Sequence, residues 1–186
     1  IYCNFAKIYR YLDKNSSIDK ITDINAVGDK YLKNNNLLKK NNRVAYAMDI
    51  NLQLSKQQIF IFRELSILNN VSVARICLHK NQKEPIQEMI MFHCKPVTVG
   101  PLKQINESIS YHIIHGEIQI SVLDKNKEVK NVYVLDNISY SNNKVNSVRI
   151  DPSDYRTISS KSENSIFLEI TNGPFKDEDT IWLNKN

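Results

Sequence analysis

The chain has 186 residues, of which 41% are hydrophobic and 24% are charged, as in a globular protein of one ordinary domain plus an extension. No apolar run reaches the roughly 18 residues that a membrane span needs, so we expect no membrane-spanning helix. The net charge of +5 and the pI near 9.0 would suit a polyanion, but the Lys residues are spread among Asn and Asp. A nucleic-acid partner is therefore not predicted.

The start of the chain, IYCNFAKIYR, has no apolar core after a basic segment, so it does not resemble a signal peptide. The chain begins at Ile rather than Met, and we expect it to be a fragment or a processed product. Residues 1–43 are rich in Lys and Asn. Apolar residues at 1, 5, 8, 9 and 12 have helical spacing, and Ser17 and Asp19 could begin a second helical segment. We predict a helical, polar extension over residues 1–43.

Residues 44–54, VAYAMDINLQL, alternate between apolar and polar side chains and predict a strand. The next stretch, SKQQIFIFRELSILNN (55–70), predicts a helix that begins at Ser55 and ends at the Asn pair. After this helix, from residue 71 onward, the sequence is mostly of the β type.

From residue 71 onward the chain contains short strand candidates separated by turn residues: VARICLH, IQEMIMFH, YHIIHGEIQISVLD, VKNVYVLD, VNSVRID and NSIFLEIT. The sequence DKNK at 124–127 separates two alternating segments and predicts a hairpin turn. Many short strands at close spacing indicate an all-β sandwich or barrel.

Three cysteines, Cys3, Cys77 and Cys94, have no metal-binding spacing and cannot all pair with one another. A reducing, cytoplasmic location is the simplest interpretation. A buried cysteine usually packs as a small hydrophobic residue, so none of the three is assigned a catalytic role.

Four stretches carry a resemblance: ARICLHKNQKEPIQEMIM (74–91), GPLKQINESISYHIIHGEI (100–118), VRIDPSDYRTI (148–158) and FLEITNGPFKDEDTIW (167–182). Together they resemble the WbuC-family cupins, a family of small bacterial cupins found among O-antigen and surface-polysaccharide genes. The resemblance covers roughly residues 50–186. It implies a mainly β fold, a single cupin jelly-roll barrel, with a domain over 44–186 and a barrel core at about 71–172.

The resemblance also implies where a metal would bind. Metal-binding cupins supply a His-x-His pair, a Glu and a closing Gly from a first motif, and one more His from a second. The closing Gly matches Gly116, which places the His pair at Leu102 and Gln104, the Glu at Ile109 and the last His at Arg156. All four ligand positions are therefore substituted.

These substitutions remove the chemistry that a metal needs. Leu102 and Ile109 have no lone pair to offer, and Gln104 has only a neutral carbonyl oxygen. The guanidinium of Arg156 has five donors, no acceptor and a permanent positive charge. We therefore predict no metal and no cofactor at the usual cupin position.

Two interpretations of this pocket remain open. In the first, which we favour, the aliphatic residues fill the barrel, and Arg156 either turns outward or pairs with a carboxylate such as Glu169 or Glu107, because a buried unpaired Arg is costly. In the second, Arg156, Gln104 and Glu169 form a polar site suited to a carboxylate or phosphate group. One polar anchor seldom defines a ligand by itself.

The four histidines give weaker signals. His112 has strand parity opposite to position 109 and should face away from the ligand centre, and His115 is a turn residue. His79 and His93 are candidates for the barrel mouth, where a lone His is more often structural than catalytic. The catalytic residues stay unassigned.

Three functional hypotheses follow. The main one is a degenerate, metal-free cupin that acts in binding or as a scaffold and is linked, through the resemblance alone, to bacterial surface-polysaccharide synthesis. Its partner would be a sugar or an anionic small molecule. The second is a metal-independent enzyme resembling cupins that isomerise or epimerise nucleotide-linked sugars. The third is a protein-interaction module in which residues 1–43 dock on a partner, or the chain forms a homodimer.

Overall fold

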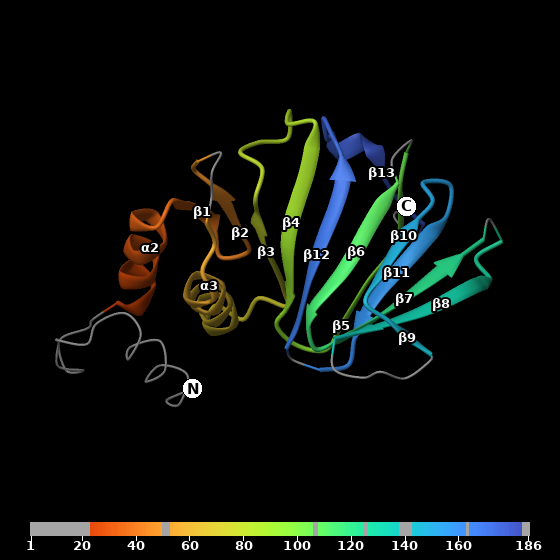
Figure 1. The fold of residues 1–186 in the computed structure, drawn as a ribbon, viewed down its shortest axis with the longest axis horizontal. Helices are drawn as coiled ribbons and strands as arrows, with labels where there is room; N and C mark the ends of the chain where they lie inside the picture. Colours follow the sequence, from red (N-terminus) through yellow and green to blue (C-terminus); the bar gives the residue numbers. More distant parts are fainter. Residues whose placement is uncertain are drawn as a thin grey trace.

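The computed structural model describes residues 23–49, 53–105, 108–124, 126–137, 143–162 and 164–183. The helix predicted near residues 1–12, the segment predicted to begin at Ser17, and the residues Cys3 and Glu107 lie outside these ranges. Within them, two helices and a hairpin at one end of the molecule adjoin two β-sheets (Figure 1).

The N-terminal layer consists of helix α2 (Ile24–Asn34), strands β1 (Leu37–Asn41) and β2 (Val44–Ala47), and helix α3 (Lys56–Leu68). Helix α3 begins as predicted, because the Ser55 side chain accepts from the Gln58 N–H and the Gln58 side chain accepts from the Ser55 N–H. Neither of these helices is long and apolar enough to cross a membrane.

Two features of this layer differ from the sequence prediction. A strand occupies residues 37–41, inside the stretch predicted to be helical, and the strand predicted over residues 44–54 ends at Ala47. The cause is tertiary pairing: β1 pairs with β2 in an antiparallel hairpin, and β2 pairs in parallel with β3, so the hairpin extends the barrel sheet. Such long-range pairing overrides local helical spacing.

The remaining elements build the barrel. They are β3 (Val73–Cys77), β4 (Ile86–His93), β5 (Val97–Gln104), β6 (Ile109–His115), β7 (Glu117–Leu123), β8 (Val129–Asp136), β9 (Lys144–Val145), β10 (Ser147–Ile150), β11 (Tyr155–Ser160), β12 (Ser165–Asn172), the short 3₁₀ helix η2 (Asp177–Asp179) and β13 (Thr180–Trp182).

The strand order is that of a jelly roll. Among the described residues, one sheet has the order β1-β2-β3-β4-β12-β6-β10 and the other β13-β5-β11-β7-β8-β9. Strands β4-β12-β6-β10 face β5-β11-β7-β8, so the chain alternates between the sheets as it does in a double Greek key. The predicted mainly β jelly-roll barrel is confirmed, and helix α2 lies within the stretch predicted to be a helical N-terminal extension.

Strand boundaries were predicted with mixed success. Strands β4 and β8 coincide with IQEMIMFH and VKNVYVLD, whereas YHIIHGEIQISVLD is divided at Gly116 between the two sheets. Gly116 has φ +77°, and a Cβ there would collide with the Asn164 backbone, so glycine is required at this crossing. Strands β5 and β11 were not among the predicted strands.

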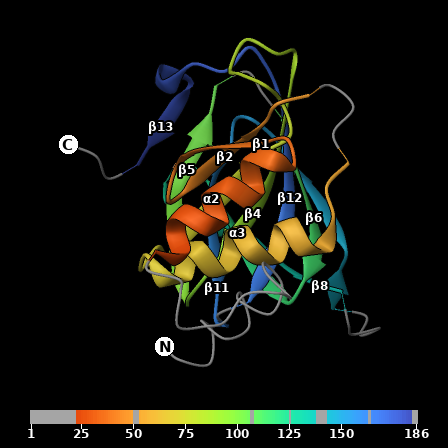
Figure 2. The same cartoon turned by 90° about the vertical axis from the view of Figure 1, so that its left-hand side faces the viewer.

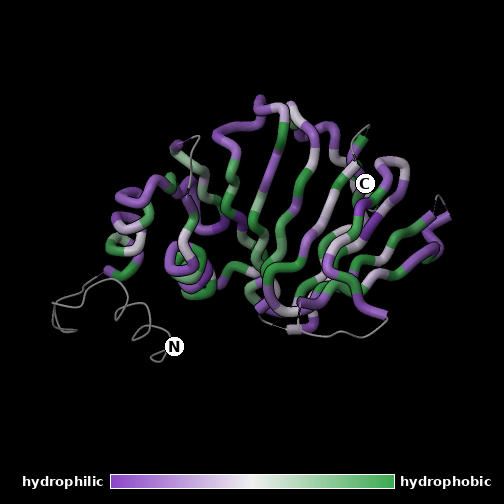
Figure 3. Tube along the Cα trace, in the orientation of Figure 1, coloured by the Kyte–Doolittle hydropathy of each residue, from purple (hydrophilic) through white to green (hydrophobic). Residues whose placement is uncertain are grey.

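Because side chains alternate along each strand, the described part of the molecule has two hydrophobic cores, one beneath the helices and one inside the barrel. Helices α2 and α3 cover one face of the sheet made by β1 to β4 (Figure 2), and Ala74, Ile76, Ile90 and Phe92 pack with them. Inside the barrel a second cluster surrounds Tyr111, with Ile118, Ile120 and Phe167. Hydrophobic and hydrophilic stretches accordingly mix along the strands, and hydrophilic residues prevail in the loops (Figure 3). Residues of β3 and β4 with the opposite parity face the barrel interior.

Candidate functional site

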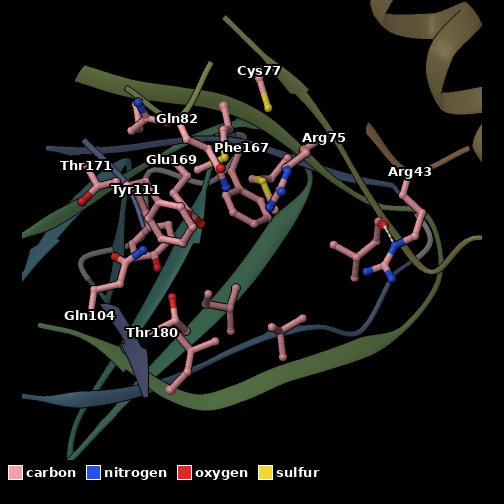
Figure 4. A pocket seen from close by; sticks show the side chains of 18 of the residues that line it. Arg43, Arg75, Cys77, Gln82, Gln104, Tyr111, Phe167, Glu169, Thr171 and Thr180 are labelled. Carbon is pink, nitrogen blue, oxygen red and sulfur yellow. Dashed lines mark hydrogen bonds between the residues drawn. The ribbon is translucent and has the colours of Figure 1, made fainter. Parts of the chain in front are cut away.

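A cavity of about 450 Å³ lies between the two sheets. One wall comes from β3, β4, β12 and β6, and the other from β5 and β11. The 24 residues around it include three arginines but only two carboxylates, Glu169 and Asp177. Figure 4 shows part of this lining, with Tyr111, Gln104 and Glu169 grouped together and Arg75 extending from its strand toward Phe167. The excess of positive charge is the main electrostatic feature of the cavity.

Four of the five residues predicted to form the pocket line this cavity: Leu102, Gln104, Arg156 and Glu169. Leu102 and Arg156 are direct cross-strand partners on β5 and β11, although they are far apart in the sequence. Ile109 is a correction to the prediction. It is buried in the barrel core and does not line the cavity, which is instead reached by Tyr111 two positions along β6.

Arg156 is buried, with 2% of its surface exposed. Its Nε donates to the Tyr111 hydroxyl at 2.6 Å, and its Nη2 donates to Gln104 Oε1 at 3.2 Å. Neither acceptor is charged. No ion pair within 4.0 Å joins Arg156 to Glu169 in the described part of the chain, so the predicted pairing with that carboxylate is not a direct contact. Two neutral acceptors therefore hold a buried cation beside the cavity.

The residues at this position do not fit a transition metal. Leu102 contributes no donor atom, and the one Gln104 carbonyl that could bind a metal already accepts from Arg156. Across the described ranges, no three His, Cys, Asp or Glu side chains lie close enough together to hold a metal ion. A guanidinium would repel a cation placed here. The donor set thus favours an anion over a cation.

Glu169 lies within electrostatic range of two of the three arginines of the cavity, Arg156 and Arg75. Burial raises the pKa of its carboxyl group, while the nearby Arg156 and Arg75 oppose that shift. Its cross-strand neighbours are Met89 on β4 and Tyr111 on β6. The Glu169 carboxyl group is therefore a titratable group in a low-dielectric site, within the electrostatic range of two arginines.

Arg75 is a site residue that sequence reasoning missed. It lies on β3 and lines the cavity, and its buried Nε has no hydrogen-bond partner in the part of the chain that the structure describes. A signal was present in VARICLH, where Ala74 and Ile76 share one apolar face and Arg75 lies on the other. An arginine that alternates with buried apolar residues indicates that the opposite face of the strand, where the arginine lies, is polar.

The N-terminal hairpin also reaches the cavity. Arg43, at the β1–β2 turn, and Tyr46, on β2, both line it, and Arg43 Nε donates to the Val73 carbonyl at 3.3 Å. The sequence predicted a boundary at residue 43, between an N-terminal extension and the barrel domain. The division into two domains stays a prediction, but the hairpin supplies part of the cavity wall.

The outward orientation that strand parity predicted for His112 is confirmed, whereas His115, predicted to be a turn residue, is the last residue of strand β6. His112 and His115 are exposed, and His79 and His93 line the cavity. Burial lowers the pKa of His93 to about 4, and it also lowers the pKa of His79. The Nδ1 of His93 lies 3.0 Å from the Ser160 Oγ, so this ring joins β4 to β11. Both rings are neutral near pH 7, which suits a structural role.

No protein-family model matches the sequence, and no curated protein matches it either. Among solved structures, oxalate decarboxylase from Bacillus subtilis matches with 17% identity and a TM-score of 0.43, over 54% of this chain and 24% of that one. The TDP-fucose-3,4-ketoisomerase WlaRA from Campylobacter jejuni matches with 18% identity and a TM-score of 0.41, over 53% of this chain and 66% of that one.

Both of these proteins have a cupin fold. The overlaps are partial, and the strand order within this chain is what establishes its jelly-roll architecture. The resemblance to the WbuC family stays a prediction, since no family model matches the sequence.

Proposed function

We propose that this protein binds a small anionic, hydroxyl-rich ligand, of the sugar class, in its barrel cavity without the help of a metal. The observation that carries the proposal is the buried guanidinium of Arg156 at the position where the cupin resemblance expects a metal-binding His. A guanidinium in a low-dielectric cavity binds carboxylate or phosphate oxygens strongly, because the hydrogen bonds are charge-assisted.

The surrounding side chains support a ligand with hydroxyl groups. Glu169 is an acceptor for hydroxyl donors, and Gln87, Gln104 and Thr180 add neutral polar groups to the same lining. Aromatic and apolar residues such as Phe167 and Met91 cover the remaining wall. An apolar cavity with a few convergent polar groups is typical of small-molecule sites.

A biological setting can be proposed from the resemblance to the WbuC family. That family is associated with bacterial O-antigen and surface-polysaccharide genes, so the ligand would be an acidic or phosphorylated sugar from that chemistry. A binding or scaffold role in that setting, in the cytoplasm and without nucleic acid as a partner, is part of the same proposal. Assembly as a homodimer stays a prediction, and light scattering on the full chain would measure it.

The proposal is tested with two measurements on protein purified without chelator. Elemental analysis should find no stoichiometric transition metal, and calorimetric titration should detect binding of an acidic sugar such as glucuronate. Arg156→Gln should weaken that binding by about tenfold or more, because one charge-assisted contact is lost. Stoichiometric metal, or binding that is insensitive to the Arg156 substitution, would contradict the proposal.

A second candidate function is metal-independent acid–base catalysis on a sugar, and Glu169 favours it. Burial raises the pKa of the Glu169 carboxyl group, and a carboxyl group that lines a cavity can exchange a proton with a bound substrate. Solvent deuterium uptake into nucleotide-linked sugars, followed by NMR, would detect such chemistry. Uptake that disappears in Glu169→Gln but persists in His112→Gln, an exposed control, would establish this enzyme, and no uptake would exclude it for the sugars tested.

A further inference from the structure

A second cavity, of about 270 Å³, adjoins the first at the junction between the N-terminal hairpin and the barrel. Asn41, Arg43 and Val44 form its hairpin side, and β3 and β4 form the other side. Arg43 and Arg75 line both cavities. Val73 and Met91 also line both cavities, so the two cavities share part of their walls.

The charge of this second cavity is unbalanced. Its lining contains Arg43 and Arg75 but no Asp or Glu. No ion pair joins either arginine to a carboxylate within the described ranges. Guanidinium groups gathered without a carboxylate attract oxyanions, because charge and geometry then match.

Hydrogen bonding also indicates an oxyanion site at these two arginines, independently of their charge. The Arg75 Nε is buried and has no partner in the described chain, which is costly unless a ligand or water accepts from it. Arg43 is held in place, since its Nε donates to the Val73 carbonyl and its backbone N–H donates to Asn41 Oδ1 at 2.8 Å. The pair thus combines one positioned arginine with Arg75, whose Nε has no partner in the described chain although its side chain also interacts with Cys77.

We propose that Arg43 and Arg75 form a second subsite, which binds an oxyanion at the junction of the hairpin and the barrel. The oxyanion is a phosphate or carboxylate group, and the sugar that carries it extends into the main cavity toward Arg156. The oxyanion subsite is inferred from this junction alone, whereas the position of the sugar rests on the proposed function. The ligand that we infer for the two cavities together is a sugar with an oxyanion group at one end.

The first experiment uses the full chain and inorganic phosphate, with binding followed by NMR chemical shifts. Arg43 is exposed, so Arg43→Gln should fold normally, and it should weaken phosphate binding by about tenfold. Lys40→Gln is a matched control, because it makes the same charge change on the same hairpin outside both of these cavities. Equal effects of the two substitutions, or no phosphate binding by the wild-type chain, would overturn the subsite.

Arg75→Lys provides a second, independent variant, since it keeps the positive charge but removes the forked donor. It should weaken phosphate binding while leaving the far-ultraviolet circular dichroism unchanged. Phosphate affinity equal to that of the wild type would mean that Arg75 contributes only general charge, and the subsite as proposed would be wrong.

The second experiment separates the subsite from the proposed function. Glucose 1-phosphate, glucuronate and glucose are compared with inorganic phosphate. Tighter binding of glucose 1-phosphate or glucuronate than of glucose, dependent on Arg43, supports the subsite and identifies its oxyanion. Glucose 1-phosphate that binds no more tightly than phosphate would contradict the sugar-binding function while leaving the subsite intact.

Discussion

Two arginines of the barrel, Arg156 and Arg75, differ in their hydrogen bonding. Arg156 lies on β11 and has its Nε and Nη2 bonded to Tyr111 and Gln104. Arg75 lies on β3 in the other sheet, and its buried Nε has no partner in the described chain. The guanidinium is thus fixed by two side-chain hydrogen bonds in the first region, whereas in the second its Nε is left without a partner.

The hydrogen bonding of Arg156 and Arg75 has different consequences for stability and for ligand binding. Where a buried cation is bonded to neutral groups of its own chain, its geometry is set before a ligand arrives, which reduces the entropy cost of binding. Where a donor is left unbonded, the folded chain bears a cost that only a ligand or water can offset. The Arg156 region should therefore matter more for stability, and the Arg75 region more for binding.

The largest expected effect tests this contrast through stability. Arg156→Ala should lower the free energy of unfolding by roughly 4 kcal/mol, because it removes buried methylene groups and two hydrogen bonds. Arg75→Ala should cost only about 1 kcal/mol, since no hydrogen bond of its Nε is lost. Urea denaturation followed by circular dichroism measures both. Equal losses would remove the distinction between the two regions.

The next prediction concerns His93, which connects the two regions. It lies on β4, next to the strand of Arg75, and contacts Ser160 on the strand of Arg156. Its pKa is about 4 in the folded chain, against about 6.5 when unfolded, so the unfolded chain binds the proton more readily. Stability should therefore fall as the pH drops from 6.5 to 4, by roughly 3 kcal/mol from this residue.

His93→Gln should lack this component. Urea unfolding of both proteins at pH 7 and pH 4 isolates it, because the carboxyl groups that titrate in the same window are common to the two chains. If the two proteins lost the same stability between these pH values, the His93 ring would not be buried as described.

A smaller effect is expected for Tyr111→Phe, which removes one hydroxyl from the Arg156 region. The Arg156 Nε then loses its 2.6 Å partner, and the free energy of unfolding should fall by about 2 kcal/mol. Tyr133→Phe is a suitable control, because Tyr133 packs at the edge of the same core. Thermal unfolding measures both variants, and an effect of Tyr111→Phe no larger than that of the control would contradict the role of the hydroxyl.

The smallest expected effect comes from the layer behind Arg75. Ser55→Ala removes the N-cap of α3 and should cost about 1 kcal/mol, whereas Ser55→Asp keeps an acceptor and should cost little. Chemical denaturation compares the two variants. If both were equally destabilised, the loss would not be due to the cap.

Much of the barrel and part of the site could be predicted from the sequence. Local alternation located β4 and β8, and the capping pattern located the start of α3 at Ser55. The cupin resemblance brought Gln104 and Arg156 together, and they are hydrogen-bonded across 52 residues of sequence. The same alignment placed Ile109 in the pocket, where Tyr111 lies instead. Spacing within a motif does not specify how far along its strand the cavity extends.

The face on which each strand residue lies follows from local sequence alone, because side chains alternate along a strand with a fixed period. The chemistry at the expected metal position also follows from the sequence, since leucine, glutamine and arginine have fixed donors and acceptors. Only the tertiary structure decided that the hairpin of residues 37–47 joins the barrel sheet and brings Arg43 beside the cavity. That outcome depends on parallel pairing between β2 and β3, whose favourable energy appears only when distant segments meet.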